Sequence, residues 1–151
     1  TEFDLAGKIW IIPPEKMKMR REHRVPLASQ SMSILEALFP LTGRGRFLFP
    51  SMRSAARPMS DNTVNAALRR LGYAQGEMCG HGFRAMASTL LNERGWAPDV
   101  IEAQLAHVDG NSVRRAYNRA LYWEERVKMM QEWADYLDEL RENTGAQDSN
   151  R

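Results

Sequence analysis

The sequence has few of the residues that form disulfides and metal sites. Its 151 residues include one cysteine, Cys79, and three histidines, His23, His81 and His107. A single cysteine rules out an internal disulfide and suits a reducing cytoplasm. No two histidines have the short spacing of a helical zinc site, so we expect neither a metal ion nor another cofactor.

Long apolar runs and nucleotide-binding loops are also missing. No run approaches the roughly 20 apolar residues that cross a bilayer, and no signal peptide opens the chain. No Gly-x-x-x-x-Gly-Lys-[Ser/Thr] motif occurs, which argues against nucleotide hydrolysis. The composition, 43% hydrophobic and 26% charged, is typical of a soluble globular protein, and the length suits one domain.

The net charge is only +2, but the charges are unevenly distributed. Residues 1–80 hold 12 basic and 7 acidic side chains, whereas residues 81–151 hold 9 and 12. Within the first half, residues 15–24 have five basic side chains and two acidic ones. Such a stretch can contact phosphates, although on charge alone a solvated hairpin tip is the favoured interpretation.

A short antiparallel β element is predicted near the start of the chain. Residues 8–12 form a β-prone run that Pro13 and Pro14 stop. Residues 24–27 form a second run, whose Pro26 favours a sheet edge or strand end. The simplest arrangement is a β-hairpin with the basic residues 15–24 on its connection.

The rest of the chain has mainly helical patterns. Helices are predicted over 34–39, ending before Pro40; from an N-cap at Ser60 to Gly72; from about Phe83 to Arg94; from Pro98 through Leu105; over 112–119; and from Trp123 to Leu140. The last helix has an apolar stripe that we expect to be buried: Trp123, Val127, Met130, Trp133, Ala134, Leu137 and Leu140. The predicted fold class is α+β, mainly α, with one domain over residues 1–142 and a flexible tail over 143–151.

Residues 81–84, with the sequence His-Gly-Phe-Arg, are the first candidate site. At the start of a helix His81 and Arg84 share a face, so both side chains can be directed at one point. Arg84 offers bidentate donors for a phosphate, and His81 can exchange a proton near neutral pH. Alone the motif is weak, because an ordinary salt bridge competes as an explanation of Arg84. Cys79 lies two residues from His81, but an inert buried thiol is a better interpretation than a nucleophile.

A tyrosine among arginines is the second candidate. Tyr117 lies ten residues after His107, and three arginines flank it: Arg114, Arg115 and Arg119. A phenol with a pKa of about 10 is a weak nucleophile, and nearby guanidinium groups favour its phenolate. By itself, this segment fits a tyrosine half-buried over an apolar surface equally well.

Taken together, these segments resemble the signature of the tyrosine recombinases, especially the integrases of prophages and integrative islands. His-Gly-Phe-Arg at 81–84, Leu-Ala-His at 105–107 and Tyr-Asn-Arg-Ala at 117–120 have the family's order and approximate spacing. Residues 17–27 resemble the family's β-hairpin, in which a catalytic lysine precedes a His-x-Val-Pro-Leu sequence. Residues 122–137 resemble the closing helix of these integrases, so the resemblance covers nearly the whole chain.

The resemblance implies site-specific recombination of double-stranded DNA, in which a mobile element is integrated or excised. Tyr117 would attack a phosphodiester to form a 3′-phosphotyrosyl intermediate, while Arg84 and His107 bind the non-bridging oxygens. His81 would be the base for Tyr117, and Lys18 the acid for the leaving 5′-oxygen. This set replaces a metal ion. DNA contacts are expected from other polar residues of the hairpin: Lys16, Arg20, Arg21 and His23.

Two of these assignments leave alternatives open, and one part of the family pattern is missing. Lys16 and Arg20 lie close to Lys18 in the sequence, and His23 is interpreted either as structural or as a phosphate contact. The family also requires an arginine in a helix before its first strands. The chain opens at 1–4 with what resembles the strand after that helix, so we expect a truncated domain that is inactive alone.

The resemblance also implies partners and a location. It implies a homotetramer on attachment-site DNA, a monomer without DNA, accessory DNA-bending or excision factors, and a nucleoid-associated protein in the bacterial cytoplasm. A non-catalytic DNA-binding module of the same fold and a type IB topoisomerase are the alternatives. The Tyr-Asn-Arg-Ala sequence and the tryptophan-containing closing helix favour the integrase.

Overall fold

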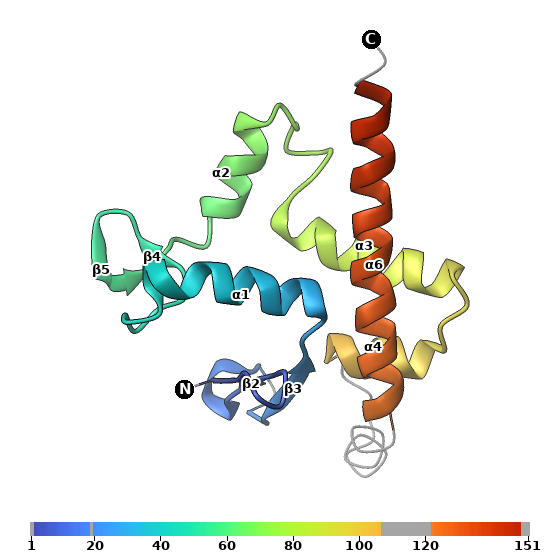
Figure 1. The fold of residues 1–151 in the computed structure, drawn as a ribbon, viewed down its shortest axis with the longest axis horizontal. Helices are drawn as coiled ribbons and strands as arrows, with labels where there is room; N and C mark the ends of the chain where they lie inside the picture. The colour runs from blue at the N-terminus through green and yellow to red at the C-terminus, as the bar shows by residue number, and fades with distance from the viewer. Residues whose placement is uncertain (1, 19, 107–121, 149–151) are drawn as a thin grey trace. The chain divides into compact units, whose positions relative to one another are not determined.

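The structure is a computed structural model that describes residues 2–18, 20–106 and 122–148. It divides into two compact units: residues 1–32 with 94–151, and residues 33–93. Helices dominate the described residues, and a three-stranded antiparallel sheet lies near the N-terminus (Figure 1). The predicted fold class is therefore confirmed, whereas the domain and tail boundaries stay predictions.

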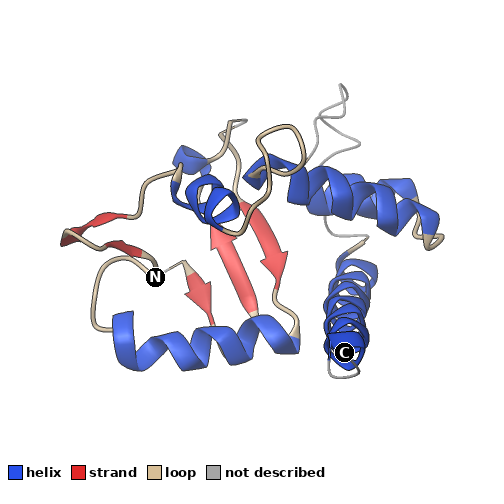
Figure 2. Ribbon diagram, turned by 90° about the horizontal axis from the view of Figure 1, so that it is seen from above, coloured by secondary structure: helices blue, strands red, loops and turns tan. Residues whose placement is uncertain are grey.

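The sheet of the first unit has the order β1 (Phe3–Asp4), β2 (Ile9–Ile12) and β3 (His23–Pro26). Strands are drawn as red arrows in Figure 2. β2 and β3 are antiparallel, with Trp10 opposite Val25. Pro26 ends an edge strand, where the N–H that proline lacks is not needed by a further strand. The predicted hairpin is confirmed, and its connection contains a short 3-10 helix, η1 (Pro14–Lys16).

Two helices, α4 (Pro98–Leu105) and α6 (Trp123–Asp148), pack against each other in the first unit. Pro98 lies in the first turn of α4, where proline loses no intrahelical hydrogen bond, as predicted. Ile101 of α4 and Met129 of α6 are completely buried, and Val100 is nearly so. These apolar side chains form the centre of the unit.

The buried face of α6 differs from the predicted apolar stripe. Val127, Leu137 and Leu140 are at least 40% exposed, whereas Arg126 is only 1% exposed. Its guanidinium donates two hydrogen bonds inside the protein, so this charged side chain can be buried although the predicted stripe did not include it. The helix also extends to Asp148, beyond Asn143, after which we expected the chain to fray.

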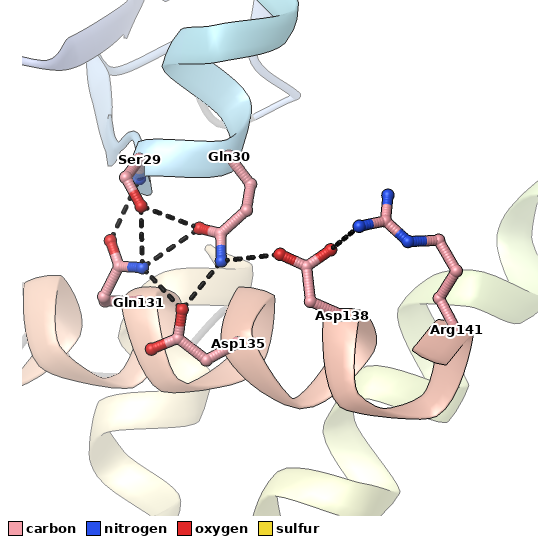
Figure 3. Close-up of polar contacts among 6 residues, drawn as sticks. All are labelled: Ser29, Gln30, Gln131, Asp135, Asp138 and Arg141. Atoms are coloured by element: carbon pink, nitrogen blue, oxygen red, sulfur yellow. Dashed lines mark hydrogen bonds and ion pairs between the residues drawn. The ribbon is translucent and has the colours of Figure 1, made fainter. Parts of the chain in front are cut away.

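Amide side chains tie the first turn of α1 (Ser29–Thr42) to α6 (Figure 3). The backbone N–H of Ser29, a donor that a helix start leaves unpaired, donates to Gln131 Oε1 at 2.9 Å. Gln30 Nε2 donates to Asp135 at 2.7 Å and to Asp138 at 3.0 Å. The hydrogen bonds from Gln30 and Gln131 lower the pKa of Asp135. The start of α1 is thus anchored by side chains of α6.

The second unit contains the rest of α1, a two-stranded hairpin of β4 (Pro50–Ser51) and β5 (Ser54–Pro58), and the helices α2 (Thr63–Arg70) and α3 (Gly80–Glu93). Leu68 and Leu91 are its buried leucines. Gly72 and Gly95 follow α2 and α3 with φ values of 96° and 84°. These left-handed conformations favour glycine and end both helices where the sequence predicts.

Two expectations for this unit were wrong, and one element was missed. Pro40 lies inside α1, and the N–H of Gly43 still donates to the Phe39 carbonyl at 2.9 Å, so the last turn is preserved. Asn62, not Ser60, occupies the N-cap position of α2 and forms no side-chain cap hydrogen bond, while Ser60 Oγ accepts from the Asn62 N–H ahead of the helix. The β4–β5 hairpin was missed, since its serine, alanine, arginine and proline residues have low β propensity.

Arg126→Ala should lower the free energy of unfolding by about 2–4 kcal/mol, because two oxygen acceptors lose their donor and a cavity forms. Arg141→Ala is the matched control on the same helix. The Arg141 side chain is 77% exposed, so its loss should change stability by less than about 0.5 kcal/mol. Urea denaturation compares the two, and equal midpoints would show that Arg126 does not hold this core together.

Candidate active site

The predicted phosphate-binding pair lies in the first turn of α3. Because α3 begins at Gly80, His81 and Arg84 are three residues apart on one helical face. The His81 side chain is exposed and that of Arg84 is half-buried. The N–H groups at the helix start attract anions, and the Arg84 guanidinium adds a full positive charge. This turn has the chemistry of a phosphate-binding element.

Helix α2 holds the backbone that leads into this turn. Asn65 Oδ1 accepts a hydrogen bond from the Gly80 N–H at 2.8 Å, and Arg69 donates to the Met78 carbonyl. Asn65 and Arg69 are one turn apart on α2, so a single face of α2 contacts residues 78–80. Cys79, which precedes α3, has no side-chain oxygen for a cap, and Asn65 supplies one from another helix.

The two candidate lysines of the hairpin in the first unit differ in their charge partners. Lys16 donates to Glu2 Oε1, and this hydrogen bond, supported by one from Trp10 Nε1, lowers the pKa of the Glu2 carboxyl. Lys18 is exposed, and within the described residues no hydrogen bond or ion pair involves its ammonium group. Lys16 is therefore partly neutralised by Glu2, whereas Lys18 keeps its charge available.

The arginines of the hairpin also differ in whether a carboxylate pairs with them. Arg20 and Arg21 are exposed, and Arg20 has a φ of 51°, a tight-turn conformation that is strained for a residue with a side chain. Arg24 forms an ion pair with Glu22 at 2.8 Å. The available positive charge of the hairpin is thus concentrated at Lys18, Arg20 and Arg21.

His23 is 4% exposed and lies beneath the surface. Its Nε2 is 3.1 Å from the Gln104 carbonyl oxygen, so this nitrogen must be the donor. The same residue, Gln104, accepts from Arg126 Nε at 2.9 Å through its side chain, and Arg126 Nη2 donates to the Arg24 carbonyl at 2.5 Å. This geometry supports the structural role of His23, because a phosphate cannot reach a buried ring.

These hydrogen bonds define a buried polar network of His23, Arg24, Gln104 and Arg126. It joins the hairpin that carries Lys18, the last turn of α4 and the first turns of α6 within one unit. His107 and Tyr117 lie outside the described residues, as does the helix predicted over 112–119. The network therefore fixes the chain on both sides of the segment that contains these two candidates.

The remaining observations concern the alternative chemistries. Cys79 is a free thiol of intermediate burial, whereas we expected a buried one. Over residues 2–18, 20–106 and 122–148, no group of three or more His, Cys, Asp and Glu side chains is arranged to hold a metal ion. Among the helices described, none combines the length and apolar character needed to cross a membrane.

Comparison with known proteins decides the family. Residues 1–124 match the Phage integrase family. The chain belongs to this family of tyrosine recombinases. It is 54% identical over 136 residues to the prophage integrase IntA of Escherichia coli K12, covering 90% of this chain and 33% of IntA. No solved structure matches the chain.

Two phage proteins are also similar. The integrase of Enterobacteria phage P4 is 45% identical over 152 aligned residues, covering 91% of this chain and 35% of that protein. The integrase of Shigella phage Sf6 is 41% identical over 137 residues, covering 90% and 35%. The chain thus spans about a third of the length of the integrases it matches.

Two supporting residues of this integrase-family chain were missed from the sequence. Asn65 has no motif of its own, because it caps α3 from a different helix. Arg126 was not part of the predicted apolar stripe of α6, although it is almost fully buried. Periodicity detects burial from apolar residues, so a charged residue such as Arg126 gives it no signal.

Asn65→Ala should destabilise the protein by about 1 kcal/mol relative to Asn92→Ala, because only the first change removes a cap. Both residues are asparagines within helices, so the gain in helix propensity is the same for the two variants. Among the described residues, the Asn92 side chain donates to the Ser88 carbonyl of its own helix and to no other helix. Thermal unfolding measures the difference, and hydrogen exchange at Gly80 and His81 should rise in the Asn65 variant alone. Indistinguishable variants would mean that Asn65 does not cap α3.

Proposed function

We propose that this chain is the catalytic part of a site-specific DNA recombinase that cuts and rejoins double-stranded DNA through Tyr117. The observation that carries the proposal is the pair His81 and Arg84 in the first turn of α3, capped from α2, in a chain of the phage integrase family. A phosphodiester has the charge and the oxygens that such a turn attracts.

The proposed reaction conserves the energy of the phosphodiester bond. The Tyr117 oxygen attacks phosphorus as its proton passes to His81, and the bond to the 5′-oxygen breaks. Lys18 gives a proton to that leaving oxygen. Arg84 and His107 donate to the non-bridging oxygens, whose negative charge grows in the transition state. Rejoining is the reverse reaction with a new 5′-hydroxyl, so it consumes no ATP.

The hairpin geometry supports Lys18 rather than Lys16 as the acid. An ammonium group that is already bound to a carboxylate is a poor proton donor to a third group, and Lys16 is bound to Glu2. The exposed Arg20 and Arg21 are proposed to contact the DNA backbone around the cut, since neither is described in an ion pair within residues 2–18 and 20–106. Their contacts would position DNA without reading its sequence.

A tetramer on attachment-site DNA is the proposed assembly, with a monomer in its absence and with accessory DNA-bending or excision factors as further partners. Val127, Leu137 and Leu140 of α6 are each at least 40% exposed and supply apolar surface for contacts between protomers. By itself the 151-residue chain should recombine poorly, because Arg84 is the one arginine it assigns to the phosphate. The family requires a second arginine on this phosphate, and the loss of one such preorganised donor lowers the rate roughly a hundred- to a thousand-fold.

Tyr117→Phe should abolish the covalent protein–DNA adduct and leave DNA binding nearly unchanged, because only the phenolic oxygen is removed. The assay uses a chimera in which this chain replaces the aligned third of IntA, with a nicked suicide substrate carrying the recombination site of IntA. Tyr122→Phe is the control, since Tyr122 lies near the same segment and its hydroxyl is 3.5 Å from Asp99. An undiminished adduct in the Tyr117 variant would end the assignment. In a second assay on supercoiled plasmids that carry the same site, relaxed plasmid without recombinant product would indicate a topoisomerase instead.

Lys18→Ala should slow cleavage by about a hundredfold or more, because the 5′-oxygen leaves without its acid. A substrate with sulfur in place of that 5′-oxygen needs no acid, since a thiolate is a good leaving group, and it should restore the rate. Lys16→Ala should slow cleavage far less and show no sulfur-dependent rescue. Rescue of the Lys16 variant and not of the Lys18 variant would exchange the two roles.

A further inference from the structure

The second unit contains a basic segment without any acidic side chain. Residues 37–60 contain four arginines, Arg44, Arg46, Arg53 and Arg57, and no aspartate or glutamate. The hairpin over 15–24, in contrast, contains two glutamates, and Glu2 and Glu22 pair with two of its basic side chains. The net charge of residues 37–60 is therefore +4, and none of it is cancelled within the segment.

The structure displays these arginines on an exposed hairpin. Every residue of β5 is exposed, and Met52 at the turn is fully exposed. All four arginines are exposed, and over the described residues none of their guanidinium groups forms an ion pair. Arg46 lies over the Phe47 ring, 5.4 Å from its centroid, which leaves its hydrogen-bond donors directed elsewhere. We call residues 44–57 the arginine hairpin.

The backbone and hydroxyl groups of the arginine hairpin add further donors. β4 and β5 form a two-stranded sheet in the described residues, so the outer edge of β5 has no neighbouring strand. Ser51 Oγ and Ser54 Oγ accept the N–H groups of Arg53 and Ala56, which leaves both hydroxyl protons to be donated outward. Small side chains at Ser54, Ala55 and Ala56 keep this edge accessible. The surface presents donors and positive charge together.

We propose that the arginine hairpin is a second DNA-binding surface, which grips the phosphate backbone of duplex DNA without reading its sequence. The choice of duplex DNA as the polyanion rests on the proposed function. Arginine forks and hydroxyl donors match phosphate oxygens, and the charge of a phosphate backbone is the same for every sequence. The surface would add affinity to the contacts made by Arg20 and Arg21.

The test measures how binding of a random-sequence duplex by the 151-residue chain depends on salt. Arg53→Ala with Arg57→Ala should weaken binding by roughly an order of magnitude and reduce the slope of log affinity against log salt by about 1.8, or 0.9 for each lost contact. Arg44→Ala with Arg46→Ala is a second variant and should act similarly. Lys128→Ala with Arg141→Ala removes the same charge from exposed positions on α6 and should leave the slope nearly unchanged.

Each outcome decides the proposal. A slope that changes equally in the arginine-hairpin and α6 variants would overturn it, as would a wild-type chain that binds no duplex at low salt. Hairpin-dependent binding to phosphatidylserine vesicles but not to duplex would assign the surface to a lipid. If the slopes are unchanged and the chimera still forms the adduct, DNA binding by the arginine hairpin is refuted and the proposed recombinase function stands. Altered slopes without any adduct would keep the hairpin and refute the recombinase.

Discussion

The buried guanidinium of Arg126 is the interaction on which the first unit depends. Removing such a charge from water costs several kcal/mol unless its donors are satisfied. The satisfying oxygens come from Arg24 and Gln104, and the ring of Trp123 lies 5.5 Å from the guanidinium carbon. Those partners belong to β3, α4 and α6, which are distant in the sequence. The charge is stable in this position only when all three elements are assembled, so it couples their formation.

The same coupling determines where the chain enters and leaves the segment that contains His107 and Tyr117. Gln104 lies three residues before His107, and Arg126 lies nine residues after Tyr117. Their side chains meet at 2.9 Å. Gln104 and Arg126 are therefore both held beside β3 of the hairpin that carries Lys18.

Local signals predicted much of this fold. Pro98, Gly72 and Gly95 mark helix ends by their own backbone geometry, so they act in the same way in any context. The hairpin of β2 and β3 was likewise predicted from local signals, namely its β-branched residues and Pro26. Pro40 was misread because the helix around it is maintained by bonds on either side of the missing donor. The buried face of α6 was missed because Arg126 finds its partners on elements that the sequence places 22 and 102 residues away.

The candidate site divides along the same line. His81 and Arg84 were predicted because their spacing and the helix start lie within one short segment. The Asn65 cap could not be predicted, since it depends on α2 meeting α3. The basic residues show most clearly what the sequence alone does not reveal. Counting them selects residues 15–24 as a phosphate-binding segment, whereas the structure shows that Lys16 and Arg24 form ion pairs with Glu2 and Glu22. A cation with a carboxylate partner must give up that partner to bind a phosphate. The number of unpaired cations, rather than the number of cations, therefore indicates where a polyanion binds.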